Sequence, residues 1–309
     1  MKTRSLRFGH HLLFGAVKLF AFVGAIFPLP VLRWMGRNLA RCARPFVPGE
    51  RRREDEHLKI AFPEMAPQSR RDLRQRSEIH FGNVAGEIAW LMHADAHQVA
   101  ALCDITGEEH LHEALEAGKG VILITGHAGN WELLNARLGV AGIPMSIAVR
   151  DIYDPRIDAF ATDIRSRFGG DVIPRRDDAA RRLLAALKGN RVVGLLIDQD
   201  IRDLPGVFVP FFGRDAWTPS GPAGFSLKIG CPTIPAFIHR RKDGRHMVEV
   251  HPPLPRPTSG STKDQIRQLT AAATAAIEKH IRTHPEQWVW MHRRWRTRPE
   301  SEEETNVQS

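Results

Sequence analysis

The stretch VILITGHAGNWELLN, residues 121–135, changes abruptly from an apolar run to a turn of small residues. Residues 121–125 are apolar or β-branched, which predicts a buried strand, and Leu133 and Leu134 belong to a helix that follows. The connection between them, Gly126 to Asn130, carries one imidazole, that of His127. Because packing alone would not require a histidine here, the turn is a candidate functional site.

The alternation of strand and helix continues after this stretch. Apolar runs at 146–149, 171–174 and 192–197 predict strands, and the segments 130–139, 155–169 and 178–189 have helical spacing. Two further runs, 232–240 and 247–250, flank Asp243-Gly244, which is a hairpin signal. This order predicts an α/β fold with a mixed, largely parallel sheet flanked by helices, in which the hairpin supplies an antiparallel edge.

Polar side chains directly follow three of the predicted strands. His127 follows 121–125, Arg150 follows 146–149, and Asp198-Gln199-Asp200 follows 192–197. Since the carboxyl ends of parallel strands lie at one edge of a sheet, we expect these residues to share a cleft there.

Glu132 is the carboxylate that we expect to orient His127. On a continuous helix, residues five positions apart lie about 140° apart around the axis and do not meet. A turn at Ala128-Gly129, with Asn130 as N-cap, would place Glu132 in the first helical turn and let the imidazole fold back toward it. A carboxylate fixes the tautomer of an imidazole and increases its basicity, as a general base requires. The alternative is that Glu132 only caps its helix and His127 is an ordinary turn residue.

The turn offers no covalent nucleophile. It contains no serine or cysteine, and the chain has no GxSxG motif. We therefore expect direct transfer to an acceptor, without a covalent enzyme intermediate.

Basic charge is concentrated at the N-terminus. The net charge is +9, and the first 53 residues contain eleven Lys or Arg against one acidic residue, Glu50. Residues 12–27 are apolar except for Lys18, and Pro28 and Pro30 follow. As a helix this run is about 24 Å long, less than the ~30 Å hydrocarbon core of a bilayer.

This segment can be a short or tilted anchor, a helix in the membrane interface, or a cleaved signal peptide. We favour an N-terminal membrane anchor helix on an anionic inner leaflet. Because the larger cluster of basic residues follows the apolar run, the main domain is expected in the cytoplasm.

Composition argues against several other classes of protein. The three cysteines have no CxxC spacing, so neither a disulfide framework nor a zinc knuckle is expected. Aromatic residues are not interleaved with a basic stripe, so we expect no nucleic-acid partner. Asp198 and Asp200 form a DxD pair, but no further carboxylate or phosphate-binding loop supports a metal there.

The stretch HAGNWE, residues 127–132, resembles the His-x4-Glu motif of the lipid A biosynthesis acyltransferases, the bacterial lauroyl and myristoyl transferases. Four longer stretches agree in order: EAGKGVILITGHAGNWE, GLLIDQDI, GVFVPFFG and HPEQWVWMHRRWRTRP. The hydrophobic N-terminus and AFPE at 61–64 agree as well, so the resemblance covers roughly residues 10–299.

The resemblance implies a fold like that of the glycerolipid acyltransferases. It implies transfer of a fatty acyl group from a thioester of acyl carrier protein, or coenzyme A, to a hydroxyl of a lipid-linked disaccharide at the bacterial inner membrane. No metal or other cofactor is implied. His127 would be the base and Glu132 its partner. We expect the substrates to contact nine further residues: Asn130, Trp131, Arg150, Arg165, Asp198, Gln199, Asp200, Arg293 and Arg294.

The residues alone leave some of these roles open. Arg165 can equally be a solvated helix residue, and Arg150 can pair with Asp151 or Asp154. The stretch GVFVPFFG, with Trp217 nearby, either lines a groove for the acyl chain or packs in the core.

Other functions also remain open. The acceptor can be a different membrane lipid, such as a phosphatidylinositol mannoside or an aminolipid. A metal-assisted hydrolase using His127, Asp198 and Asp200 is a different class, and a docking module without catalysis is a third. We divide the chain into an anchor or interfacial segment (1–45), an acyltransferase domain (46–299) and an acidic tail (300–309), for which we expect disorder.

Overall fold

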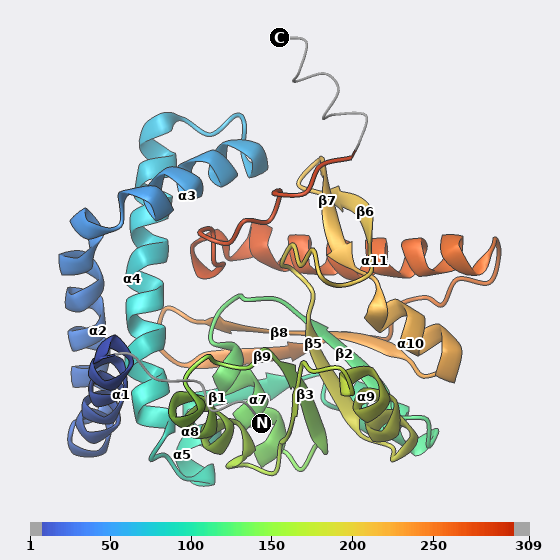
Figure 1. Ribbon diagram of the computed structural model, residues 1–309, viewed down its shortest axis with the longest axis horizontal. Helices are drawn as coiled ribbons and strands as arrows, with labels where there is room; N and C mark the ends of the chain where they lie inside the picture. Colours follow the sequence, from blue (N-terminus) through green and yellow to red (C-terminus); the bar gives the residue numbers. More distant parts are fainter. Residues whose placement is uncertain (1–7, 300–309) are drawn as a thin grey trace.

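Seven strands form one mixed sheet in the computed structural model, which describes residues 8–299 (Figure 1). The seven strands are β1 (Cys103–Thr106), β2 (Val121–Thr125), β3 (Met145–Val149), β4 (Asp171–Pro174), β5 (Val192–Leu196), β8 (Thr233–Arg240) and β9 (His246–Val250), and two further strands are β6 (Gly206–Phe211) and β7 (Arg214–Pro219). The order in the sheet is β1-β9-β8-β2-β5-β3-β4, and only β8 and β9 pair antiparallel within it. Strands β6 and β7 form a separate antiparallel pair.

The predicted, largely parallel sheet is confirmed. Strands β2 and β4 have the expected bounds, and β3 and β5 each differ from them by one residue. The hairpin of β8 and β9 is antiparallel as predicted, but its position at the edge was wrong. The unpredicted strand β1 pairs in parallel with β9 and covers that edge. Its sequence, CDIT, contains no apolar run from which a strand could be predicted.

Helices flank the sheet and extend to one side of it (Figure 1). The helices are α1 (Phe8–Ile26), α2 (Leu29–Ala43), α3 (Pro48–Ala61), α4 (Pro67–Leu91), α5 (Ala96–Leu102), α6 (Glu109–Glu116), α7 (Trp131–Val140), α8 (Pro155–Ser166), α9 (Ala179–Lys188), α10 (Gly221–Ile229) and α11 (Thr262–Thr283). Two short 3₁₀ segments are η1 (Arg44–Phe46) and η2 (Pro285–Gln287).

Both faces of the sheet are buried, each against its own core. Alternate residues of β2 point to opposite faces, so Ile122 and Ile124 join one core and Val121 and Leu123 the other. The first core contains Ile277 of α11, and the second contains Leu133 at the start of α7. A strand buried on both faces must be apolar throughout, which explains the continuous run in VILIT.

Helix α2 crosses α4 at close contacts between glycines. A Cβ atom at Gly36 would lie 2.0 Å from the carbonyl oxygen of Gly82, and one at Gly86 would lie 2.4 Å from that of Leu32. Only glycine allows backbones to approach this closely. The N-terminal helices therefore pack onto α4 (Figure 1).

The predicted membrane anchor helix is not supported. The described part of α1 contains 19 residues, among them Lys18 and two histidines, and the helix ends before Pro28. Over residues 8–299, no helix has both the length and the apolar character that crossing a membrane demands. Residues 1–7 of the predicted N-terminal segment, and the whole predicted acidic tail 300–309, lie outside the described residues.

Candidate active site

His127 and Asp198 meet because β2 and β5 are parallel neighbours in register. Thr125 pairs with Leu196, so the residues two positions further along leave the same edge side by side. Nδ1 of His127 lies 2.7 Å from Oδ1 of Asp198, and the backbone N–H of His127 donates to Oδ2 at 2.7 Å. The indole N–H of Trp288 donates to the same Oδ2 at 2.8 Å. One carboxylate thus holds both the ring and the backbone of the turn.

The environment of Asp198 keeps its carboxyl group ionised. Burial by itself would raise the pKa of Asp198, but the charge and hydrogen bond of His127, with His292 and Trp288, outweigh burial and hold this pKa well below its usual range. An ionised carboxylate only accepts hydrogen bonds, so Nδ1 of His127 carries the hydrogen. The lone pair of a neutral His127 ring is then on Nε2, which can accept a proton from a hydroxyl.

The ring of His127 is accessible, whereas the carboxylate behind it is sealed. The side chain of His127 is 19% exposed and that of Asp198 is 0% exposed. The amide nitrogen of Gln199 lies 3.2 Å from Nε2 of His127 and 3.1 Å from Nδ1 of His292, so it bridges the two rings. The rings of His292 and Trp131 both lie edge-on to the ring of His127. The distances between ring centroids are 4.9 Å for His292 and 5.0 Å for Trp131. Burial, followed by the charge of His127, lowers the pKa of His292 to about 4, so His292 is neutral at neutral pH.

The predicted contact between His127 and Glu132 is wrong. Glu132 does lie in the first turn of α7, and Asn130 is the N-cap as predicted, with Oδ1 accepting from the N–H of Leu133 at 3.1 Å. The carboxylate of Glu132, however, binds Arg165 of α8, whose Nη2 lies 2.6 Å and Nε 3.0 Å from Oε1. The prediction considered only local geometry, whereas the neighbouring strand brings a closer carboxylate from residue 198.

Arg165 and Arg150 have different surroundings from one another. The bidentate contact with Glu132 means that Arg165 is not the solvated helix residue that the sequence left open. Arg150 is exposed at the end of β3. Asp151 and Asp154, its predicted alternative partners, pair instead with Arg176 and Arg156.

Two predictions are wrong: Asp200 does not face the predicted cleft, and Arg294 does not make the predicted substrate contact. Asp200 accepts from the backbone N–H of Thr297 at 2.5 Å and from its hydroxyl at 2.9 Å, so it anchors the C-terminal segment. Arg294 is fully buried, and it donates to the carbonyl of Trp217 and the hydroxyl of Thr218 in β7. A buried guanidinium bound in this way cannot contact a substrate phosphate. Its neighbour Arg293 is exposed.

The C-terminal segment contributes two residues whose place in the site the sequence did not predict. Trp288 and His292 both lie in WVWMHRRW, a stretch that agreed with the family but carried no assigned role for them. The segment pairs with the turn itself: Gly129 N–H donates to the carbonyl of Gln287 at 2.8 Å, and Val289 N–H donates to that of His127 at 3.2 Å. Residues far along the chain from His127 therefore complete its surroundings.

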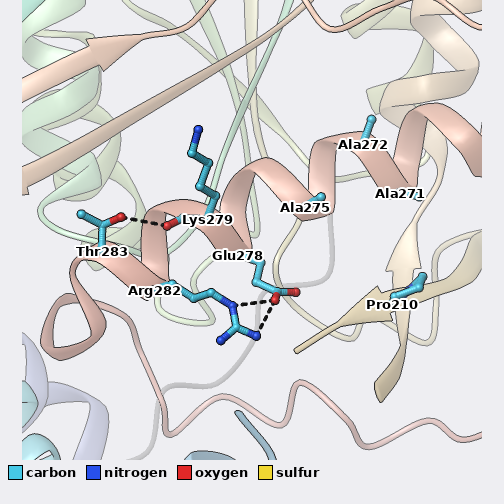
Figure 2. A pocket seen from close by; sticks show the side chains of 8 residues that line it. All are labelled: Pro210, Ala271, Ala272, Ala275, Glu278, Lys279, Arg282 and Thr283. Atoms are coloured by element: carbon cyan, nitrogen blue, oxygen red, sulfur yellow. Dashed lines mark hydrogen bonds and ion pairs between the residues drawn. The ribbon is translucent and has the colours of Figure 1, made fainter. Parts of the chain in front are cut away.

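The stretch GVFVPFFG packs mainly in the core. Val209, Phe211 and Phe212 are buried, and Phe211 lies against Trp288 and Trp295. Pro210 points the other way and lines a groove of about 650 Å³ beside α11, together with Ala271, Ala272, Ala275, Glu278, Lys279, Arg282 and Thr283 (Figure 2). None of these lining residues belongs to the His127 cluster, so this groove is separate from the candidate site.

The three residues proposed for a metal-assisted hydrolase do not form a metal site, although two of them, His127 and Asp198, are in contact. Both oxygens of Asp198 are used by His127 and Trp288, and Asp200 binds Thr297. Among residues 8–299, no three His, Cys, Asp or Glu side chains are arranged to hold a metal ion. This donor set does not fit the chemistry that the hydrolase requires.

The fold and the cluster together define an α/β enzyme with a carboxylate-oriented histidine at the carboxyl edge of a mostly parallel sheet. The comparison with known families is more specific. The chain belongs to the bacterial lipid A biosynthesis acyltransferases, whose family model matches residues 2–297. It is therefore an acyltransferase, as the resemblance in sequence predicted.

Individual relatives agree along most of the chain. A lipid A biosynthesis lauroyltransferase of Escherichia coli (strain K12) is 27% identical over 276 residues, 88% of each chain. A palmitoleoyltransferase of the same pathway and organism is 27% identical over 280 residues, 89% of this chain and 88% of the relative. A phosphatidylinositol mannoside acyltransferase of Mycolicibacterium smegmatis is 27% identical over 195 residues, 62% of each.

Proposed function

We propose that the protein transfers a fatty acyl group from a thioester, carried by acyl carrier protein or coenzyme A, to a hydroxyl of a lipid A precursor. The observation that carries this proposal is the hydrogen bond between His127 and Asp198 in a chain of this family. The relatives named for lauroyl and palmitoleoyl transfer in lipid A biosynthesis support the acceptor class.

His127 acts as the general base in this reaction. Its Nε2 atom takes the proton of the acceptor hydroxyl while the hydroxyl oxygen attacks the thioester carbonyl carbon. The new C–O bond forms a tetrahedral intermediate, whose C–S bond then breaks to give the ester. The departing thiolate takes the proton back from Nε2, so His127 returns to its neutral form. Asp198 stabilises the imidazolium between these two steps, because its charge faces Nδ1.

The Glu132–Arg165 pair supports this arrangement from α7 and α8. It fastens the helix that starts after the catalytic turn to the helix that follows β3. Trp131 and Gln199 lie against the His127 ring, where they would contact the substrates. Arg150 and Arg293 are exposed cations that suit anionic groups of either substrate.

The N-terminal helices are suited to lie in a membrane interface. Nine of the twelve large hydrophobic side chains that are exposed in the described residues lie between residues 13 and 47. Trp34 and Leu39 of α2 are 59% and 71% exposed, on a helix that also carries Arg37 and Arg41. Exposed apolar and basic side chains on one element favour an anionic lipid surface. The enzyme would thus work on the cytoplasmic side of the inner membrane, where its lipid acceptor is embedded.

A reconstituted assay tests the function directly. Purified protein is mixed with a lipid A precursor in detergent micelles and with either acyl carrier protein or coenzyme A thioesters of different chain length. Mass spectrometry of the lipid then shows whether one acyl group is added and from which donor. His127→Ala is expected to lower turnover by roughly 10²–10⁴-fold without loss of folding. Unchanged turnover in His127→Ala would rule out the proposed base.

A phosphatidylinositol mannoside is the second candidate acceptor, because a mycobacterial relative is named for it. The same assay with that lipid in place of the lipid A precursor decides between the two. In cells, loss of one secondary acyl group from lipid A on deletion of the gene would favour the first acceptor.

A further inference from the structure

A second buried carboxylate, Glu87 of α4, lies behind the catalytic turn. It is 1% exposed and is the meeting point of four structural elements, α2, α4, β8 and β9. Its Oε1 atom faces three basic groups: Nη2 of Arg33 at 2.6 Å, Nη2 of Arg240 at 2.7 Å and Nε2 of His246 at 3.1 Å. Burial alone would raise the pKa of Glu87, but these neighbours outweigh it and hold the pKa well below its usual range. Glu87 is therefore ionised.

The other oxygen of Glu87 faces the turn. Nδ2 of Asn130 donates to Oε2 at 3.0 Å. Asn130 is itself 1% exposed, and its Oδ1 caps α7 by accepting from Leu133 N–H at 3.1 Å. A carboxylate repels the amide oxygen, so Glu87 determines which end of the Asn130 amide points to the helix. Glu87 and the N–H of Leu133 thus favour the same orientation of the Asn130 amide, the one that the cap requires.

Through His80, the basic residues around Glu87 are also linked to Gly129, the residue before Asn130 in the turn. Nε2 of His80 lies 3.3 Å from the carbonyl oxygen of Gly129, and Nδ1 of His80 lies 3.2 Å from Nη1 of Arg240. Gly129 has φ +61°, and a Cβ atom there would lie 2.0 Å from the carbonyl oxygen of Ile238. The turn is thus held by contacts with α4 and β8 and, separately, by the hydrogen bonds to Asp198.

We infer that Glu87 is a positioning residue for acyl transfer, which acts through Asn130 to set where α7 begins and hence where His127 and the Glu132–Arg165 pair lie. This inference rests on the proposed function. The competing explanation is that Glu87 only compensates buried cations between α2, α4, β8 and β9. That explanation predicts a loss of stability but no specific effect on the turn.

An exchange of the two functional groups separates these explanations. Glu87→Gln and Asn130→Asp each weaken the hydrogen bond between these two side chains. The first removes the negative charge of residue 87, and the second places two carboxylates against one another. In the double variant, the amide introduced on α4 would be the donor and the carboxylate introduced at the N-cap would be the acceptor. The charge of the cluster is then the same as in the wild type, and an aspartate is a good N-cap.

We expect each single variant to lower kcat by about 10- to 100-fold, because small displacements of catalytic groups are costly. The double variant should recover to within about threefold of the wild type, because the two sites are directly coupled. All rates are measured on the folded fraction, determined from thermal melts. Glu54→Gln is the matched control. Glu54 is also a buried glutamate, 3% exposed, but it lies on α3, whereas the contact to Asn130 comes from α4.

Hydrogen exchange of the Leu133 amide gives a readout that does not depend on activity. Protection of this amide should fall in Glu87→Gln and return in the double variant, because Asn130 Oδ1 is its acceptor. Normal kcat and normal protection in Glu87→Gln would overturn the inference, as would a double variant no better than the singles. If the wild type transferred no acyl group, the proposed function would fail, and the exchange data would still decide the role of Glu87 in positioning the turn.

Discussion

The ring of His127 is bound by Asp198, 71 positions away in the sequence, at 2.7 Å. Asp198 also binds the backbone of His127 and the indole of Trp288, so three segments of the chain meet at one buried carboxylate. This contact places the hydrogen of the imidazole on Nδ1 and its lone pair on Nε2, which the Gln199 amide contacts at 3.2 Å. The site therefore depends on how β2 and β5 pair and on the C-terminal segment that covers them.

Replacement of Asp198 tests the importance of this contact. In Asp198→Asn the amide can donate to Nδ1 and hold the ring in the opposite tautomer, so we expect kcat to fall by roughly 10²–10⁴-fold. The free energy of unfolding should fall by about 1–3 kcal/mol, because donors around a buried carboxylate lose an acceptor. Steady-state kinetics and urea unfolding measure the two effects. Asp104→Asn, which alters a surface pair with Arg241 and Arg245, is the control and should change neither by much.

The Glu132–Arg165 pair should behave as a unit. Glu132→Gln and Arg165→Met each leave one partner without its counter-charge, and each should lower kcat by about 10- to 100-fold. Because the two side chains touch, the double variant should be no slower than the slower single variant. A double-mutant cycle on kcat measures this coupling. Losses that multiply would mean that Glu132 acts independently of Arg165.

Acid should destabilise the protein through its buried histidines. Burial lowers the pKa of His292 to about 4 and those of His80 and His280 to about 3, whereas an unfolded histidine titrates near 6.5. Between these values the unfolded chain binds more protons than the folded one, so the free energy of unfolding falls as the pH is lowered from about 6.5 toward 4. Four more histidines with lowered pKa values act in the same direction: His57, His246, His251 and His284.

Glu54 acts in the opposite sense and is a useful internal check. Burial, with the charge of Glu78, raises its pKa to about 7, so its contribution to stability is lost as the pH rises through that value. Unfolding by urea from pH 7 to 4 measures the net slope. We expect His280→Gln to make this slope shallower and Glu54→Gln to make it steeper. If neither variant changes the slope, other groups are responsible for the acid sensitivity.

Binding to lipid should depend on the exposed face of α2. Trp34→Asp with Leu39→Asp replaces two apolar side chains with charges, and the double variant should bind anionic vesicles at least about tenfold more weakly. Vesicle sedimentation at low and high salt measures this, and higher salt should weaken binding of the wild type. Ala275→Asp on the exposed side of α11 is the control. If the α2 double variant bound vesicles as tightly as the Ala275→Asp control, α2 would be excluded as the lipid-binding element.

Local patterns predicted several parts of the structure correctly. The apolar run of β2, the N-cap at Asn130 and the place of Glu132 in the first turn of α7 all depend on neighbouring residues. The largely parallel sheet followed from the order of strands and helices. Errors occurred where a short element carries no apolar pattern, as in β1, or where an apolar run shorter than the bilayer core was still interpreted as a membrane anchor, as in α1.

The residues that approach His127 were decided only by the tertiary structure. By itself, the sequence determined that a strand ends in a small turn with a histidine, because hydrophobic periodicity and helix capping act over a few residues. It could not determine that Asp198 rather than Glu132 binds the ring, that Arg294 is buried, or that Trp288 and His292 close the site. Those outcomes depend on which strands pair and in what register, and pairing is set by the burial of the whole sheet between two cores.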